Sequence, residues 1–213
     1  MNKIKLWQDW IKDIANDLID VADNRHVFNE FHAVLERNTE LQKGNIFLDY
    51  IIANYASAMV SAIFRIADDK KGTASLTRLL REIAVDSRLL NKQWFGEQYE
   101  KTESAIPKEI GYRDYENNFE ETHHLTQDDI EKDIKAIEQA TSKINSFRHK
   151  RIAHKDANKS VKINTSFKDL YDTIDALKPL VHKYYLLLTQ GDIELESTIT
   201  YDWERIFREP WEK

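Results

Sequence analysis

The chain has 213 residues, with 31 Lys and Arg against 37 Asp and Glu, 41% hydrophobic residues and no cysteine. These values fit one soluble domain and exclude disulfide scaffolds and thiolate metal sites. Five glycines and three prolines beside 32% charged residues favour helices, so we expect an all-α protein. The net charge of -6 argues against wholesale coating of nucleic acid but leaves room for a local basic patch.

The N-terminal segment does not resemble a targeting peptide, because residues 1–18 carry acids throughout and lack an apolar core followed by small residues. The longest uncharged run, Tyr50 to Phe64, is shorter than the roughly 17–25 residues that cross a bilayer. We therefore expect a cytoplasmic protein with no membrane partner, and a buried core helix in this run.

The first ninety residues show four helical patterns. Apolar residues recur every three or four positions over 6–21, and a second helix is expected over 26–41. Residues 46–69 form the most apolar pattern and are expected in the middle of the core. A fourth helix is expected over 75–90. The apolar stripe of the first helix consists of Leu6, Trp10, Ile14, Leu18 and Val21, and that of the fourth consists of Leu76, Leu79, Leu80 and Ile83.

Residues 95–125 lose this periodicity and become polar with scattered aromatic residues. We expect a long loop or a partly helical insertion there, within a single domain that covers residues 1–213. The five glycines, at positions 44, 72, 96, 111 and 191, lie between apolar segments and are interpreted as helix ends.

Two capping signatures mark helix starts in the C-terminal part. Thr126 with Asp129, and Ser166 with Asp169, have the residue types and spacing of a capping box. The second is expected to open a helix that Pro179 bends or restarts. The tail is expected to end in a short additional helix.

A concentrated basic segment covers residues 143–162, which contain seven Lys or Arg and one Asp. Such a patch on an acidic protein indicates where a phosphate chain would be attracted. The alternative is a solvated helix end at which cations complement the helix dipole. The basic residues are Lys143, Arg148, Lys150, Arg151, Lys155, Lys159 and Lys162.

Within this segment Arg148 and His154 are separated by five residues, of which the first is the polar His149 and the last is the small Ala153. This pattern resembles the HEPN family, whose motif is an Arg, four to six residues that often begin with a polar one, and then a His. The context agrees with the resemblance, because the motif ends a predicted long helix and precedes a polar loop and a capped helix.

A second stretch is similar to the abortive-infection, AbiU-type branch of HEPN proteins, which carries an Arg, an Asp three residues later and a Ser-Leu-x-x-Leu-Leu helix start. In this chain the matching residues are Arg65, Asp68, Ser75, Leu76, Leu79 and Leu80. The likeness extends over about residues 45–210. It implies an antiparallel HEPN-like helical bundle with additional N-terminal and C-terminal helices.

The resemblance also implies a function. It indicates a metal-independent endoribonuclease without a cofactor, in which two identical chains place their motifs at a shared cleft. The expected role is a phage-defence effector or a toxin, with RNA as substrate and with a neutralising antitoxin or an activating partner.

The chemistry of the motif residues suits that reaction. Imidazole titrates near neutral pH, so His154 is assigned proton transfer, and the planar guanidinium of Arg148 is assigned to the phosphate. His149 could orient the phosphate or share the proton transfer. On a straight helix Arg148 and His154 would lie some 120° apart and about 9 Å along the axis, so a bent helix end or a second subunit is needed to complete the site.

Four groups of residues have weaker assignments. Arg65 and Asp68 form either a plain surface pair or supports beside the catalytic groove, and we expect Arg65 to compensate the Asp68 charge at a helix C-terminus. Lys150, Arg151 and Lys155 either contact the RNA backbone or are simply solvated. The histidine pairs at positions 26/32 and 123/124 lack the carboxylates of a metal site, so we expect no metal.

One departure from the family and one rival function remain. Asp156 stands where some toxin members carry a Tyr two residues after the motif His, which argues against control by nucleotidylation at that position. The rival function is a non-catalytic HEPN-fold module that binds RNA, a nucleotide or a partner protein.

Overall fold

The computed structural model describes residues 3–38, 40, 43, 45–102, 105–119, 124–147 and 166–207. Over these residues the chain is helical, as the composition predicts, and no strand is assigned. The helices in chain order are α1 (Lys3–Arg37), α2 (Ile46–Ala67), α3 (Leu76–Val85), the 3₁₀ helix η1 (Ser87–Leu90), α4 (Lys92–Glu100), α5 (Lys108–Phe119), α6 (Gln127–Phe147), α7 (Phe167–Thr189) and the 3₁₀ helix η3 (Trp203–Phe207).

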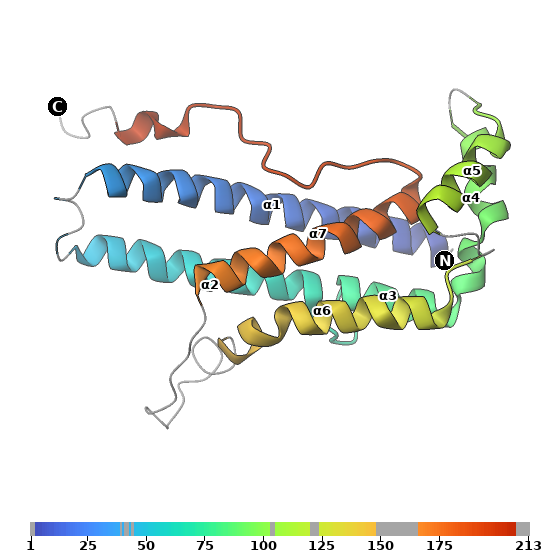
Figure 1. Cartoon of the computed structure of the whole chain (residues 1–213), viewed down its shortest axis with the longest axis horizontal. Coiled ribbons are helices and arrows are strands. Elements are labelled where there is room, and N and C mark those ends of the chain that lie inside the picture. The colour runs from blue at the N-terminus through green and yellow to red at the C-terminus, as the bar shows by residue number, and fades with distance from the viewer. Residues whose placement is uncertain are drawn as a thin grey trace.

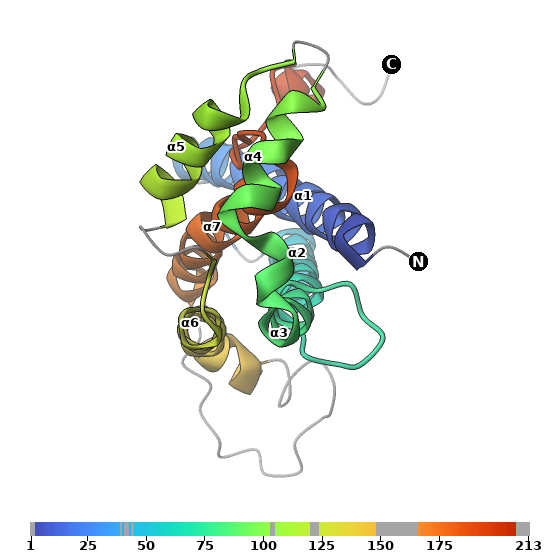
Figure 2. The same cartoon turned by 90° about the vertical axis from the view of Figure 1, so that its right-hand side faces the viewer.

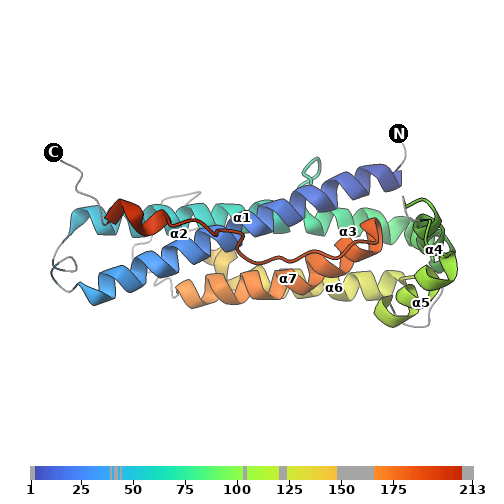
Figure 3. The ribbon, with the colours of Figure 1, turned by 90° about the horizontal axis from the view of Figure 1, so that it is seen from above.

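The helices build an elongated bundle (Figure 1). α1 packs against α2 and α7, α6 packs against α3 and α7, and α2 and α3 follow one another along the long axis. The α4–α5 hairpin lies across the end of the bundle at which the N-terminus lies, as the end-on view shows (Figure 2). The last turns of α1 and the first turns of α2 project beyond α6 and α7 at the opposite end (Figure 3).

α1 is one helix of 35 residues, about 52 Å long, and the predicted break between residues 21 and 26 is wrong. The intervening residues include no Gly or Pro, and the Asn24 side chain donates to the carbonyl of Asp20, one turn earlier. The predicted stripe is confirmed at Ile14, Leu18 and Val21, which are buried. In the first turns Trp7 and Ile11 are buried and the predicted neighbours Leu6 and Trp10 are only half-buried.

The predicted helix starts and the predicted buried face of α3 are confirmed, but the helix expected over 75–90 ends at Val85 and is followed by η1. Leu76, Leu79, Leu80 and Ile83 are fully buried. The Asp129 amide donates to Thr126 Oγ1 over 3.2 Å and the Thr126 amide donates back to the Asp129 carboxylate over 3.3 Å. The same reciprocal capping joins Ser166 to Asp169 at the start of α7. α7 continues through Pro179 without restarting.

The 95–125 stretch, expected to be a loop or a partly helical insertion, contains most of α4 and all of α5. Gly96 and Gly111 lie inside these helices, so their interpretation as helix ends is wrong. A Cβ on Gly111 would lie 2.8 Å from the Gly96 Cα, so the two glycines let the helix backbones touch. Gly72, with a φ of 90°, does occupy a turn, as predicted.

α2 begins at the predicted residue and ends two residues before the predicted end, but its burial differs from the prediction. Its C-terminal half contributes Met59, Val60 and Ile63 to the core, whereas Ile46, Phe47 and other residues of the N-terminal half are exposed. By length and composition α2 could cross a membrane, which is weak evidence for a single helix, and only 22% of its most apolar 18-residue window is buried.

The segment after α7 runs back along α1 (Figure 1). Asp23 accepts hydrogen bonds from the Ser197 hydroxyl and the Thr198 amide, each over 2.7 Å. The Trp203 indole N–H donates to Glu30 over 3.0 Å. The short predicted C-terminal helix is present as η3.

Candidate functional site

The predicted catalytic motif connects α6 to α7. α6 ends at Phe147 and α7 begins at Phe167. The motif residues and the predicted RNA contacts between these helices lie outside the described residues: Arg148, His149, Lys150, Arg151, His154 and Lys155. Their placement stays a prediction. The described part of the site consists of the end of α6, the start of α7 and a groove that α1, α2, α3 and α6 form.

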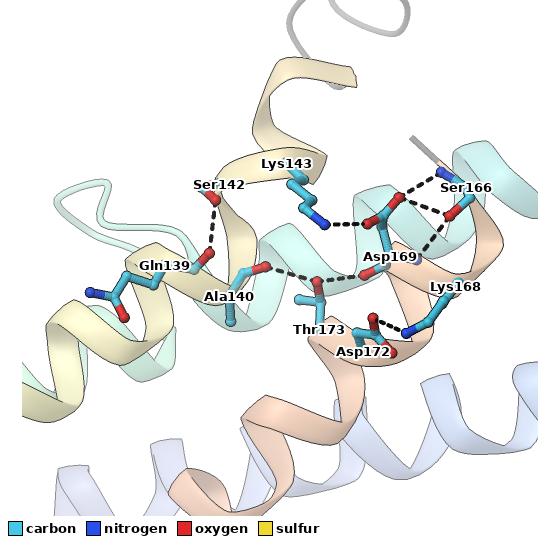
Figure 4. A network of polar contacts seen from close by, with 9 residues as sticks. All are labelled: Gln139, Ala140, Ser142, Lys143, Ser166, Lys168, Asp169, Asp172 and Thr173. Carbon is cyan, nitrogen blue, oxygen red and sulfur yellow. Dashed lines mark hydrogen bonds and ion pairs between the residues drawn. The ribbon is translucent and has the colours of Figure 1, made fainter. Parts of the chain in front are cut away.

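A network of polar contacts joins the end of α6 to the start of α7 (Figure 4). The Lys143 ammonium, on the last turns of α6, donates to the Asp169 carboxylate over 2.9 Å. The other oxygen of that carboxylate accepts from the amide and the hydroxyl of Ser166. Thr173 donates to the carbonyl of Ala140 over 2.9 Å, one helical turn further into the bundle. The two ends of the intervening chain are therefore fixed relative to one another.

The electrostatics of this network favour both charged forms. The Lys143 hydrogen bond, and then the bonds from Ser166, hold the pKa of Asp169 well below its ordinary value. The same contact raises the pKa of Lys143. Lys143 was counted in the predicted basic patch, but its charge is partly matched by Asp169, which leaves that patch less basic than the sequence indicates.

Arg65 and Asp68 lie at the C-terminal end of α2, but they are not joined in the predicted way. The Arg65 guanidinium lies 3.5 Å from the carboxylate of Asp17 on α1, and no partner for the Asp68 carboxylate is found within the described part of the chain. Asp68 is the C-terminal cap of α2, and its amide donates to the carbonyl of Phe64. Arg65 thus links α2 to α1 and does not pair with Asp68 as predicted.

Ser75 explains why the Ser-Leu-x-x-Leu-Leu pattern starts where it does. Its buried hydroxyl caps α3 by accepting from the Arg78 amide over 3.4 Å and also donates to the carbonyl of Asp68. The Thr77 hydroxyl donates to the neighbouring carbonyl of Ala67 over 2.9 Å. These two hydroxyls satisfy carbonyls that the end of α2 leaves open and so fix Asp68 against the start of α3.

Two hollows meet at Asp68 and Phe64. The larger, with a volume of about 480 Å³, lies between α1, α2 and the loop before α3. The smaller, of about 230 Å³, lies between α2, α3 and α6 and reaches Asn145. Asn145 is three residues before Arg148 in the sequence. The two hollows, which share Phe64 and Asp68 as lining residues, are together called the groove. The larger hollow is lined by Asp17, Ser61, Phe64, Arg65, Asp68, Thr73 and Ala74.

The described walls of this groove carry more carboxylates than cations. Asp69 and Glu138 line the smaller hollow, and both are held by Arg81 from α3, at 2.8 Å and 3.5 Å. Asp17 and Asp68 line the larger one. A polyanion would therefore find few positive groups on the described walls.

Sequence reasoning missed three contributors to this groove, namely Asp17, Phe64 and Asn145. Asp17 belongs to the polar face of α1 and Phe64 to the core pattern of α2, and neither carries a local signal. Only the packing of α1 against α2, and of α2 against α6, brings them together. Asn145 could have been noticed from its position three residues before the motif Arg.

Two of the histidines considered for metal binding, His26 and His32, lie beside carboxylates on their own helix. His26 lies 3.5 Å from Glu30 and His32 lies 3.4 Å from Glu36, each one turn away on α1. His123 lies outside the described residues. Among the residues that were described, no group of three or more His, Asp or Glu side chains could hold a metal ion.

Comparison with known proteins relates the chain to a family. No curated protein and no solved structure matches the chain significantly. The family model HEPN_AbiU2, described as AbiU2, matches residues 4–212, which is a longer region than the resemblance seen in the sequence. Because this match covers nearly the whole chain, the protein belongs to the AbiU2 family of HEPN proteins.

Proposed function

We propose that the protein is a metal-independent endoribonuclease of phage defence, acting in the cytoplasm as a homodimer. Its family relates it to abortive infection. The observation that carries the nuclease proposal is the groove at Asp68, whose smaller hollow is lined by Asn145, three residues before the Arg148 to His154 motif in the sequence.

The distribution of charge suits a division of labour in this groove. Arg148, Lys150, Arg151 and Lys155 supply the positive charge that phosphate oxygens require. The carboxylates on the described walls repel phosphate but accept hydrogen bonds from the N–H groups of bases. An RNA strand would therefore lie with its backbone toward the motif segment and with bases or sugars toward α2.

The chemistry follows from the side chains. One imidazole takes the proton of a 2'-hydroxyl, whose oxygen attacks the adjacent phosphorus in line, and the bond from phosphorus to the 5'-oxygen breaks. The imidazolium formed in this way gives its proton to the leaving 5'-oxygen, and the products are a 2',3'-cyclic phosphate and a 5'-hydroxyl. The guanidinium of Arg148 stabilises the charge that grows on the phosphate oxygens, and His154 moves the proton.

One observation favours a second function, a non-catalytic binding module. The described groove carries Asp17 and Asp68 on either side of a single exposed guanidinium, that of Arg65, and this arrangement would also suit a basic segment of a partner protein. Expression separates the two functions, because an active nuclease arrests growth and a binding module is tolerated.

The direct test is incubation of the purified protein with total cellular RNA in the presence of EDTA. We expect cleavage that Arg148→Ala and His154→Ala abolish, with products that carry 2',3'-cyclic phosphates and 5'-hydroxyls by mass spectrometry. Arg37→Ala and His32→Ala, at exposed positions of α1, are the matched controls and should cleave normally. Loss of activity with EDTA, or products with 5'-phosphates, would refute the mechanism.

A further inference from the structure

A further hollow, of about 350 Å³, lies where η1 meets α4, at the end of the bundle that the α4–α5 hairpin covers (Figure 2). Its lining residues are Arg88, Asn91, Lys92, Gln93 and His124. Among the described residues no carboxylate lines it, whereas the two hollows of the groove, and the one between α5, α6 and α7, are each lined by at least two. On a chain with a net charge of -6, this hollow is therefore a local site of positive charge.

The backbone around this hollow is fixed by Asn91. Its side-chain oxygen accepts from the Trp94 amide over 2.8 Å and so caps α4, and its side-chain amide donates to the carbonyl of Arg88 over 2.8 Å. The backbone of Asn91 also forms an isolated antiparallel bridge with that of His124. One residue thus holds η1, the start of α4 and the segment before α6 together, so the lining groups are in place before any ligand binds.

The charged and polar groups of the hollow differ in what they already contact. Arg88 is exposed, and no partner for its guanidinium is found in the part of the chain that the structure describes. The same holds for the imidazole of the half-buried His124, which carries an N–H donor whether or not it is protonated. The Lys92 ammonium pairs with Glu116 of α5 and lies 5.7 Å from the centroid of the Tyr112 ring. The charge of Lys92 is therefore shared, and that of Arg88 is not.

We propose that this hollow binds the phosphate group of a small organic molecule. The guanidinium of Arg88 offers paired N–H donors in one plane, which match two oxygens of a phosphate. His124 donates a further hydrogen bond, and Lys92 and the N-terminal end of α4 add positive charge. The volume of about 350 Å³ lies at the lower end of the range of small-molecule sites, about 300–1,000 Å³, and so leaves room for a short organic group.

The surroundings favour a compact phosphate over a nucleic-acid strand. Gln93 donates to Glu97 over 2.9 Å and Lys92 pairs with Glu116, so carboxylates lie directly beyond the lining residues. A strand that passed through the hollow would bring its next phosphates close to these carboxylates and would be repelled.

The hollow is also distant from the predicted catalytic motif. His124 precedes α6 and Arg148 follows it, and the 21 residues of α6 extend over about 30 Å. A ligand in the hollow is therefore not the phosphate that the nuclease would cleave, and the proposal does not rest on RNA cleavage.

Isothermal titration calorimetry on the RNA-free protein at low salt tests this site, with glycerol 3-phosphate and inorganic phosphate as probes. We expect both to bind, and glycerol 3-phosphate to bind more tightly, because the hollow has room for its organic part. Arg88→Gln should weaken binding at least about 10-fold, and His124→Ala about 3-fold or more. The helical circular dichroism of both variants should be unchanged, since neither side chain has a partner among the described residues to lose.

Arg113→Gln is the matched control. Arg113 is an exposed residue of α5 that does not line the hollow, and its substitution removes the same charge. Arg113→Gln should therefore bind both probes as the wild type does. Equal weakening by Arg88→Gln and Arg113→Gln would show that only the overall charge of the protein matters, and it would overturn the site.

Other results would also contradict the proposal. Failure of both probes to bind at millimolar concentration, or binding by Arg88→Gln that equals that of the wild type, would remove the site. Succinate that binds as tightly as glycerol 3-phosphate would show that the hollow does not select phosphate. Inorganic phosphate that binds more tightly than glycerol 3-phosphate would overturn the assignment to an organic phosphate. Because no RNA is present in these titrations, they stand apart from the outcome of the cleavage assay.

Discussion

The contact between Lys143 and Asp169 gives the sharpest prediction about stability, because it joins α6 to α7 across the motif segment. Asp169→Ala removes an ion pair whose lysine is 73% exposed, worth about 0.2–1 kcal/mol, and half of a capping box, worth about 1 kcal/mol. The expected loss is about 1–2 kcal/mol, which for a chain of this length lowers the Tm by about 2–8 °C. Thermal unfolding by circular dichroism at neutral pH measures it.

The neighbouring pair provides a matched control. Lys168 and Asp172 lie 2.6 Å apart within α7, and of the two only the Asp172 charge acts on α6, with the smallest of the effects on the pKa of Lys143. Asp172→Ala should therefore cost no more than about 0.5 kcal/mol. Equal shifts in Tm for Asp169→Ala and Asp172→Ala would refute the reasoning that the bridging pair and its cap hold the two helices together.

The same contact predicts a pH dependence. The folded-state pKa of Asp169 is lowered from the ordinary 3.8, so its contribution to stability is complete above that value and is lost as the pH falls through the folded-state pKa. The difference in Tm between wild type and Asp169→Ala should shrink when unfolding is measured below pH 3.8. A difference that stays constant into strong acid would show that the carboxylate charge is not its cause.

The remaining predictions concern other parts of the chain. Ser75→Ala should lower the free energy of unfolding by about 1–3 kcal/mol, measured by urea titration, because it removes the cap of α3 and leaves the carbonyl of Asp68 without its donor. Gly111→Ala should lower the Tm, since a clash of about 1–3 kcal/mol with the Gly96 backbone outweighs the gain in helix propensity of about 1 kcal/mol, and a raised Tm would show that α4 and α5 can move apart. Lys155→Ala should weaken RNA binding modestly and reduce its dependence on salt by about one counterion, as titrations at several salt concentrations can test.

Local signals in the sequence predicted what local physics determines. Thr126 and Ser166 mark the starts of α6 and α7 because a hydroxyl and a carboxylate three residues apart suffice to cap a helix. The leucines of α3 are predicted for a similar reason, since their spacing alone sets one buried face. The groove partners were not predictable in this way, because the contact of Arg65 with Asp17 joins residues that are 48 positions apart.

The errors share one physical cause. Contacts between helices decide whether a glycine ends a helix and whether an apolar residue is buried, and the local sequence does not show these contacts. Glycine is common at helix ends, yet Gly96 and Gly111 lie inside α4 and α5, where the lack of a side chain allows the two helices to touch. In the second half of α2 the polar residues Asn54, Ser57 and Ser61 mark the exposed side, but the first turn begins with the apolar Ile46 and Phe47, so the sequence there does not indicate which side is exposed. The predicted core position was correct for Val60 and wrong for Phe47 for this reason.

The packing of α1 against α7 has a consequence for synthesis on the ribosome. α1 is synthesised well before α7, the helix that packs against it. Ser197 and Thr198, which donate hydrogen bonds to Asp23 of α1, are synthesised later still. A nascent chain that ends before Phe167 leaves the apolar stripe of α1 partly uncovered. The described walls of the groove, from Asp17 to Asn145, are therefore all synthesised before the helix that holds α1 in place, and the bundle is complete only after α7 has been made.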